Sequence, residues 1–402
     1  MKAAQGCKLF GAYEALSGIQ DSVVLLHSVV GCNFGTMAFH AACDMAHIRQ
    51  TCTVISDTEV VFGGEKSLRK ALDYVEELFQ PRVIFVVTGC ISDMIQDDVR
   101  SVAQAHKGPA KVVFVEAAGY RGKMKEGQEA AMKALAELAE APVPVSKGCP
   151  KKVILVGLGS DDFRLDQDTK ALQKLAGENI ELQVLANTTA EELEKAANAD
   201  LILTVGYGEA YGKRMNQKYG IPWKSLDYPY GLTGAQEFWQ SLGEQFGDPQ
   251  GIWKIGYETA ESAFRSHTGE SLSKVYSYLQ ALYSMPAAVI GAKAKCHGMK
   301  RFLEQELGME VVVCAEREQV TDVERFYDKV RQSEAAVLFG SSFERELAEK
   351  LEIPLVRFDY PVFDRLSLSG RCYVGEEGSL CLVEDILNEI MAARNRKGAL
   401  YQ

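Results

Sequence analysis

The chain has 402 residues, and a hydrophobic share of 47% fits two or three globular domains and excludes an intrinsically disordered protein. Its 44 Lys and Arg against 55 Asp and Glu give a formal net charge of −11, which argues against nucleic-acid binding by phosphate neutralisation. No apolar run approaches the roughly 18–20 residues of a membrane-spanning helix, and the N-terminus has no signal-peptide core. We therefore expect a cytoplasmic protein with neither a nucleic-acid nor a membrane partner.

Short apolar, β-branched runs recur along the chain, each followed by a glycine-containing turn and a helical pattern. Continuous apolar runs of this kind are typical of parallel strands that are covered on both faces. In chain order, the predicted strands are Ser22–His27, Arg82–Thr88, Lys111–Val115, Lys152–Gly157, Asp200–Val205, Ala287–Gly291, Glu310–Cys314 and Ala335–Gly340. The segment Glu65–Phe79 reads as an amphipathic helix, whose apolar face includes Leu68, Leu72 and Leu78. The alternation predicts α/β sheets with right-handed crossovers.

Two proline-containing stretches, 141–150 and 284–286, each precede a new predicted strand. They divide the chain into three expected domains, 1–148, 149–283 and 284–402. Ligands of parallel α/β sheets bind at the carboxyl ends of the strands. The residues directly after each apolar run are therefore the positions at which to look for chemistry.

Ten cysteines raise the question of which are buried hydrophobes and which carry metal or redox chemistry. Disulfides are disfavoured in the cytoplasm. Cys32 and Cys90 follow predicted strands and Cys7 lies in the N-terminal lead-in, and each is preceded by glycine. Glycine lets the backbone approach a bulky ligand, and thiolates at such positions suit an iron–sulfur cluster. On spacing alone, three buried thiols remain the alternative, since no Cys-x-x-Cys signal is present.

The first hundred residues resemble the component 1 proteins of the nitrogenase family. The residues that carry the resemblance are Gly31-Cys32, the Asp57–Glu65 segment with its Val-Phe-Gly-Gly, and the Thr88–Asp98 strand end with Asp97-Asp98. Segments further along extend it over essentially the whole chain with β-type features, namely Lys218–Trp223, Gly231–Gly234, Gly298–Leu303, Leu307–Glu310, Gly340–Glu344, Pro361–Arg365 and Gly375–Gly378.

The resemblance implies three Rossmann-like αβα domains with mainly parallel sheets, the first of which binds an iron–sulfur cluster. It implies that Cys7, Cys32 and Cys90 hold that cluster, either [4Fe–4S] or P-cluster-like, at a subunit interface. The implied function is a component 1 subunit that passes low-potential electrons to a substrate or metallocofactor in an interdomain cavity.

The implied electron donor is an ATP-dependent iron–sulfur reductase, which is a P-loop dimer and similar to nitrogenase reductase. The chain itself has no Walker A motif, consistent with a separate ATPase partner. Three cysteines per subunit imply either a homodimer or a heterotetramer with an α-type component 1 subunit.

The chain departs from the dinitrogen-reducing pattern at both ligands of the iron–molybdenum cofactor. The region Leu201–Tyr211, where the family's catalytic subunit has a cysteine, has none, and no histidine follows His297. Dinitrogen reduction by this chain alone is therefore not expected, and a second metallocofactor remains open.

Five further residues are candidates for lining a cavity: His40, Cys43, Lys293, Cys296 and His297. Cys296 and His297 follow a predicted strand beside lysines, which lower a thiol pKa. The alternatives are a helix face with a buried cysteine and solvated charges around His40 and Cys43, and a basic loop that opens a helix around Lys293. The remaining cysteines are assigned to structural positions, with Cys52 undecided but favoured as buried: Cys52, Cys149, Cys314, Cys372 and Cys381.

Two other function classes compete with a reductase subunit. The chain could be a scaffold on which a nitrogenase-type metallocluster is assembled, which would also use the interface cluster. It could instead be a non-redox α/β ligand-binding protein whose cysteines are merely buried.

Overall fold

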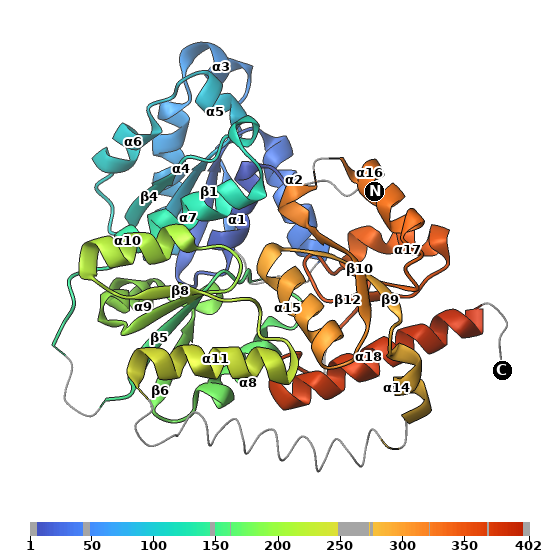
Figure 1. The fold of residues 1–402 in the computed structure, drawn as a ribbon. Coiled ribbons are helices and arrows are strands. Elements are labelled where there is room, and N and C mark those ends of the chain that lie inside the picture. Colours follow the sequence, from blue (N-terminus) through green and yellow to red (C-terminus); the bar gives the residue numbers. More distant parts are fainter. Residues whose placement is uncertain are drawn as a thin grey trace. The chain divides into compact units, whose positions relative to one another are not determined.

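The computed structural model describes residues 6–42, 49–144, 149–160, 162–247, 273, 276–320, 322–367 and 370–396. In these residues, helices alternate along the chain with strands, and the strands form three parallel four-stranded sheets (Figure 1). The predicted α/β class with mainly parallel sheets is confirmed. Within the described part, no helix is both long and apolar enough to cross a membrane.

The first sheet has the order β2-β1-β3-β4. Its central strands β1 and β3 are buried along their whole length and pair in parallel, with Ser22 opposite Val83 and His27 opposite Thr88. The two strands therefore end level, and the residues that follow them emerge at one edge. The elements of this region are α1 (Lys8–Ser17), β1 (Ser22–His27), α2 (Val30–Ala42), β2 (Gln50–Cys52), α3 (Asp57–Phe62), α4 (Glu65–Phe79), β3 (Val83–Thr88), α5 (Cys90–Met94), α6 (Val99–Ala105), β4 (Lys111–Val115), η1 (Gly119–Arg121) and α7 (Met124–Leu138).

The second sheet has the order β6-β5-β7-β8, and its central strands β5 and β7 pair in parallel. Its region comprises β5 (Lys151–Val156), α8 (Leu165–Ala176), β6 (Ile180–Val184), η2 (Leu185–Asn187), α9 (Ala190–Glu194), η3 (Lys195–Asn198), β7 (Leu201–Thr204), α10 (Glu209–Tyr219), β8 (Trp223–Ser225) and α11 (Gly231–Phe246).

The third sheet has the order β10-β9-β11-β12 with parallel pairing throughout. Its elements are α14 (Tyr276–Leu282), β9 (Pro286–Gly291), α15 (Lys293–Gln305), β10 (Glu310–Glu316), η5 (Arg317–Gln319), α16 (Val323–Gln332), β11 (Val337–Gly340), η6 (Ser342–Glu344), α17 (Arg345–Leu351), β12 (Leu355–Arg357) and α18 (Gly375–Arg396).

Each of the eight predicted strands is present, with ends that differ by no more than two residues. The sequence missed β2, β6, β8 and β12, each of which lies at the edge of its sheet. The helix Glu65–Phe79 is α4, with Leu68 and Leu72 buried, but Leu78 is exposed. The assignment of Leu78 to the apolar face was therefore wrong. Leu78 is six residues beyond Leu72, and with about 3.6 residues per turn this spacing places it on a different side of the helix.

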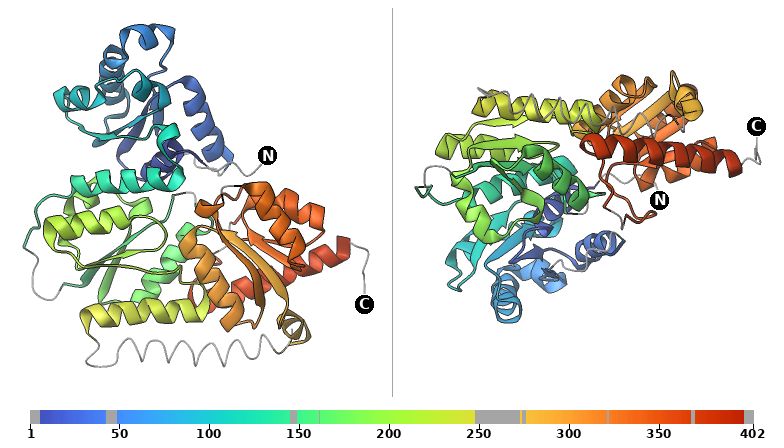
Figure 2. Two further views of the ribbon diagram at one scale, coloured as in Figure 1. Left: turned by 45° about the horizontal axis from the view of Figure 1, so that its top comes forward. Right: turned by 90° about the horizontal axis from the view of Figure 1, so that it is seen from below.

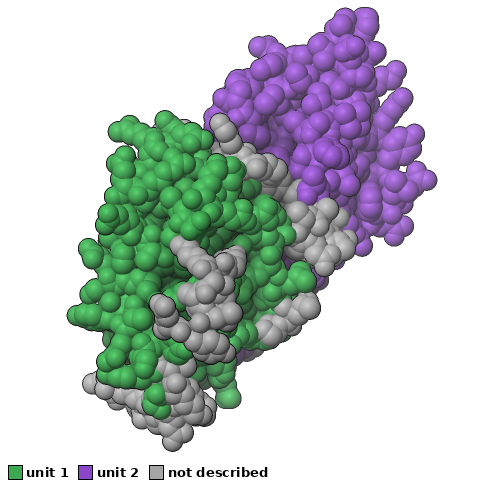
Figure 3. All heavy atoms as spheres, turned by 90° about the vertical axis from the view of Figure 1, so that its right-hand side faces the viewer, with its two compact units in different colours: residues 1–4, 162–182, 224–402 green, residues 5–161, 183–223 purple. Residues whose placement is uncertain are grey.

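The chain forms two compact units (Figure 3). We number the units in chain order of their described residues, so the first unit is the one coloured purple and labelled unit 2 in Figure 3, and the second is the green one labelled unit 1. The first unit contains the described residues of 5–161 and 183–223, and its largest core gathers Leu16, Phe85, Leu135, Ile154 and Tyr211. The second unit contains the described residues of 162–182 and 224–402. Three sheets agree in number with the three expected domains, while the boundaries 1–148, 149–283 and 284–402 stay a prediction.

In the second unit, the long helix α18 packs against α11 (red and yellow in Figure 2), and both contact α8. Asp168 of α8 is buried, and its carboxylate accepts hydrogen bonds from Tyr228 Oη and Tyr373 N, both at 2.6 Å. Burial raises the pKa of Asp168 to about 6, although both hydrogen bonds act to lower it. The buried ends of these helices are thus joined by a polar network rather than by apolar packing alone.

Candidate functional site

The three Gly-Cys positions all lie in the first unit, each at the start of a helix. Cys7 is the residue before α1, Cys32 lies in the first turn of α2, and Cys90 opens α5 directly after β3. The positive ends of α1 and α2 favour the ionised form of a cysteine there. The glycine before Cys90 is needed for a close approach, because a Cβ on Gly89 would lie 2.0 Å from Ser28 Oγ.

Two of the cysteines, Cys7 and Cys90, meet at Gly119 of η1, and Cys32 lies close enough to both to interact with them electrostatically. A Cβ placed on Gly119 would lie 3.0 Å from Cys7 Sγ and 3.3 Å from Cys90 Sγ. Burial raises the pKa of Cys32, the Ser28 hydroxyl lowers it, and the nearby Cys7 and Cys90 raise it again. The structure therefore brings Cys7, Cys32 and Cys90 together, and their role as ligands stays a prediction.

The donor set suits a multi-iron cluster better than a single metal ion. Cys7, Cys32 and Cys90 are half-buried free thiols, and cysteine thiolates are the usual ligands of iron–sulfur clusters. Within the described ranges, no three His, Cys, Asp or Glu side chains converge closely enough to ligate one ion. A cluster is wider than one ion and needs its thiols further apart, and Gly119 has no side chain that would crowd Cys7 Sγ and Cys90 Sγ.

One buried carboxylate joins the motif segments around the cysteines. Asp97 accepts from Gly64 N, with Oδ1 at 2.9 Å and Oδ2 at 3.1 Å, and its Oδ2 lies 3.0 Å from His27 Nε2. His27 is fully buried, and its Nδ1 lies 3.0 Å from Thr53 Oγ1. Burial lowers the pKa of His27, and the hydrogen bond to Asp97 partly opposes that shift. Asp97 thus joins the end of β1 and the start of α4 to the segment that follows Cys90, and His27 extends the network to Thr53 after β2.

The elements that carry the cysteines and Gly119 also expose large apolar side chains. Phe34 of α2 is 72% exposed, and Met94 of α5 and Tyr120 of η1 are more than half exposed. Phe62 of the neighbouring α3 is 84% exposed. Aromatic residues and methionine exposed in this way are typical of protein–protein interfaces.

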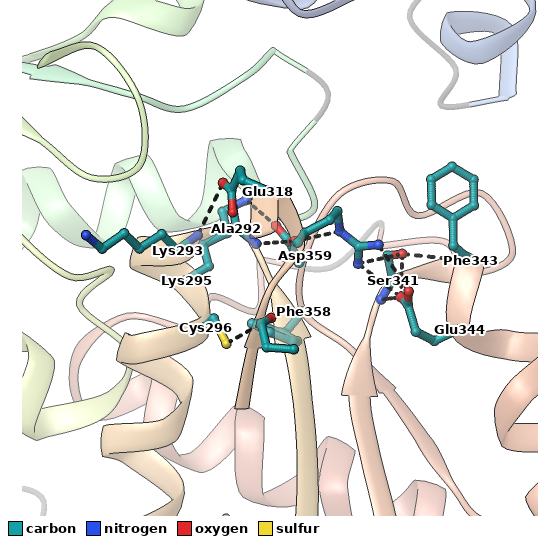
Figure 4. Close-up of polar contacts among 12 residues, drawn as sticks. Ala292, Lys293, Lys295, Cys296, Glu318, Ser341, Phe343, Glu344, Phe358 and Asp359 are labelled. Carbon is teal, nitrogen blue, oxygen red and sulfur yellow. Dashed lines mark hydrogen bonds and ion pairs between the residues drawn. The ribbon is translucent and has the colours of Figure 1, made fainter. Parts of the chain in front are cut away.

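A separate cavity of about 870 Å³ lies in the second unit, between α15, β10 and α16. His297 and Cys314 are among its lining residues, whereas Lys293 and Cys296 are not. His297 Nε2 lies 3.2 Å from Glu316 Oε1. Cys296 is fully buried, and the exposed Lys293 side chain extends away from its neighbours in Figure 4.

The carboxyl ends of β9, β11 and β12 meet at a cluster of buried charges, the Asp359 network (Figure 4). Lys295 Nζ pairs with Asp162 and lies 3.4 Å from Asp359 Oδ1, while Asp359 Oδ2 accepts from Ala292 N at 2.8 Å. Although burial alone would lower it, Asp162 and Asp359 raise the pKa of Lys295 above its usual value. This edge of the third sheet is therefore filled by its own paired side chains.

The other predicted positions are more scattered. The side chain of His40 in α2 and the whole of Cys43 lie outside the described residues. Cys372 is buried, as expected of a structural thiol, but Cys149 is exposed. Cys52 Sγ lies 3.4 Å from Ser28 O, close to Cys32, which raises its pKa in addition to the larger effect of burial.

Gly119 is the position that sequence reasoning missed. It follows β4 by four residues, at the same kind of strand end that singled out Cys32 and Cys90. Its position after a strand could have identified it. A glycine has no side chain that could supply a ligand or a catalytic group, however, and Gly119 was not selected for that reason.

Comparison with known proteins decides the family. Residues 7–391 match the model of the family described as nitrogenase component 1 type oxidoreductase. The chain belongs to this family. A solved structure described as nitrogenase Cp1 at pH 6.5 superposes with a TM-score of 0.80 at 19% identity, covering 99% of this chain and 94% of that one.

Three curated relatives show the range of names among similar proteins. The nitrogenase molybdenum–iron protein alpha chain of Methanosarcina barkeri is 29% identical over 77% of this chain, which spans 59% of that relative's length. The iron–molybdenum cofactor biosynthesis protein NifE of the same organism is 27% identical, and the similarity covers 86% of this chain and 77% of that relative. The molybdenum–iron protein beta chain of Methanococcus maripaludis is 25% identical, and the similarity covers 96% of this chain and 93% of that relative.

Proposed function

We propose that this component 1 chain is a subunit of a nitrogenase-like reductase, in which Cys7, Cys32 and Cys90 hold an iron–sulfur cluster at a subunit interface. The observation that carries the proposal is the proximity of the three thiols, since Cys7 and Cys90 meet at Gly119 and both act on Cys32. Such a cluster, when bound, relays electrons one at a time. The chain's own part is to supply three ligands and, through Gly119, to keep a side chain away from two of them.

The half-buried state of the thiols supports an interface site. A cluster held by three cysteines from one chain keeps part of its coordination open, and a second subunit closes it across a twofold or pseudo-twofold axis. The exposed Phe34, Met94 and Tyr120 give that second subunit an apolar surface to cover. The second subunit is another copy of this chain or an α-type component 1 chain.

The proposed electron donor is a separate ATP-dependent iron–sulfur reductase of the P-loop type. The acceptor is a substrate or metallocofactor bound by the component 1 assembly. The segment 201–211, which holds β7 and the start of α10, contains no cysteine, and this supports an acceptor other than the iron–molybdenum cofactor held in the dinitrogen-reducing manner.

Anaerobic purification with the reductase tests the proposal. The reconstituted protein should carry about four irons per dimer if the cluster is [4Fe–4S], should be coloured, and should give an electron paramagnetic resonance signal after reduction. It should also oxidise the reduced reductase only when ATP is present. A colourless, iron-free protein after anaerobic reconstitution would overturn the proposal.

Filling the space at Gly119 should weaken cluster binding without unfolding the chain. In Gly119→Val, the added carbons would occupy the gap beside Cys7 Sγ and Cys90 Sγ, so we expect the iron content to fall by at least half. Gly31→Ala is the matched control, since a Cβ there would meet nothing within 4 Å although Gly31 adjoins Cys32. Equal iron contents in the two variants, measured with unchanged circular dichroism, would argue against a cluster at this position.

A scaffold for metallocluster assembly is the second candidate function. The similarity to the cofactor biosynthesis protein NifE, which extends over 86% of this chain, favours it. A scaffold would release a bound metallocluster to an acceptor protein, whereas a reductase subunit would retain its metal over many turnovers. Iron and molybdenum analysis of the chain before and after incubation with an apo-acceptor distinguishes the two.

A further inference from the structure

Two cysteines lie in direct contact in the second unit, far along the chain from the Gly-Cys positions. Cys296 Sγ on α15 is 3.1 Å from Cys314 Sγ on β10, and both are free thiols. A disulfide has an S–S distance of about 2.05 Å, so the two sulfurs would need to approach by only about 1 Å. Helix α15 packs directly on β10, which holds the pair together.

The two thiols differ in their access to solvent. Cys296 is 0% exposed, and its sulfur lies 3.5 Å from the carbonyl oxygen of Ala315. Cys314 is exposed and lines the 870 Å³ cavity. One thiol is therefore open to a reagent and the other is sheltered behind it, which is the arrangement of an attacking and a resolving cysteine.

The electrostatic surroundings reinforce this division of roles. The hydrogen bond with Cys296 lowers the pKa of Cys314 and so does Lys300, whereas burial, Glu316 and Glu304 act to raise it. The hydrogen bond to Cys314 and burial both raise the pKa of Cys296. Cys314 is thus the thiol that ionises first and can attack.

The lining of the cavity indicates the kind of reagent that fits. It combines cationic side chains with carboxylates on the same walls, so it suits a small molecule that carries both carboxylate and ammonium groups. The cationic residues are Lys300, Arg301, Arg325 and Lys329, and the acidic residues are Asp227, Glu237, Glu304, Glu316 and Asp322.

We propose that Cys314 and Cys296 form a redox-active dithiol that exchanges with a zwitterionic low-molecular-weight disulfide bound in this cavity. The Cys314 thiolate attacks one sulfur of the small disulfide, whose S–S bond breaks, and the departing thiolate takes up a proton. Cys296 then loses its proton and attacks the Cys314 sulfur, which releases the second small thiolate with that proton. Two protein thiols are oxidised to one disulfide, and the small disulfide is reduced to two thiols.

The proposal is independent of the cluster and is tested on the full-length wild-type chain with oxidised glutathione as the probe. After incubation, free thiols are alkylated and the protein is digested with trypsin. Cleavage after Lys295, Lys300, Arg301 and Arg317 places Cys296 in the peptide 296–300 and Cys314 in the peptide 302–317. We expect these peptides to become disulfide-linked, with both thiols lost at the same glutathione ratio and both recovered after dithiothreitol.

Two variants and an internal control sharpen the test. In Cys296→Ser, Cys314 should accumulate as a stable mixed disulfide with glutathione. In Cys314→Ser, Cys296 should remain a free thiol, because it is buried. The exposed Cys149 reports general reactivity in the same digest. Modification of Cys149 without any link between 296–300 and 302–317 in the wild-type chain would overturn the proposal, whether or not the variants fold.

Discussion

The proposed cluster site predicts that replacing Cys90 by alanine leaves the protein folded but unable to hold iron. Cys90 opens α5 at the end of a fully buried strand, and its sulfur is one of the two that lie nearest to Gly119. Removing one of the three proposed thiolate ligands leaves two, too few to retain a cluster through purification. Iron and acid-labile sulfide should fall at least tenfold after anaerobic reconstitution, and the visible absorption should disappear.

Cys381→Ala is the matched control for this loss. Cys381 is a half-buried free thiol in α18, within the other compact unit, and its removal should leave the iron content unchanged. Circular dichroism and thermal unfolding of both variants separate loss of metal from loss of fold. The assignment of Cys90 as a ligand fails if the two variants retain the same amount of iron.

Replacing Lys295 by methionine will destabilise the protein by about 3–5 kcal/mol, because it removes the buried cation that pairs with both Asp162 and Asp359, although Arg317 still lies 3.7 Å from Asp359 Oδ2. The Lys295 side chain is 7% exposed, and those of Asp162 and Asp359 are 9% and 3% exposed. Methionine keeps most of the length and apolar contact of lysine, so the loss measures the charge rather than a cavity. The free energy of unfolding in denaturant, followed by tryptophan fluorescence, is the measurement.

Lys293→Met provides the comparison for this substitution. Lys293 is exposed on the same helix, and its replacement should change the unfolding free energy by no more than about 0.5 kcal/mol. Adding Asp162→Asn to Lys295→Met should restore part of the lost stability, since one of the two buried negative charges that Lys295 offsets is removed. Equal unfolding free energies for the Lys293 and Lys295 variants would contradict this account of the Asp359 network.

The fold was predictable where burial dominates the sequence. Central strands such as β1, β3 and β9 are covered on both faces, so their continuous apolar runs are visible in the sequence. The four missed strands lie at sheet edges, where pairing on one side and partial exposure allow polar residues and short lengths. In β6, for example, buried Leu182 alternates with the exposed Glu181, and this pattern does not resemble a central strand.

The candidate site was predictable only as a set of positions. Residues after strands are visible in the sequence, so the convergence of Cys32 and Cys90 followed from the level ends of β1 and β3. The cysteine pair was not predictable, because the meeting of Cys296 with Cys314 depends on which face of α15 packs on β10. Cys314 was therefore predicted to be a structural thiol, although it lines a cavity.

The Asp97 carboxylate bears on protein engineering. Transferring the three Gly-Cys segments to another α/β scaffold would move the thiols without the carboxylate that joins the end of β1 and the start of α4 to the segment after Cys90. His27, Gly64 and Asp97 come from segments up to 70 residues apart and meet through hydrogen bonds of 2.9–3.1 Å. A transferred site would therefore need these three residues as well as the cysteines. The smallest segment that contains all of them is about the first 120 residues, and three short motifs would not be enough.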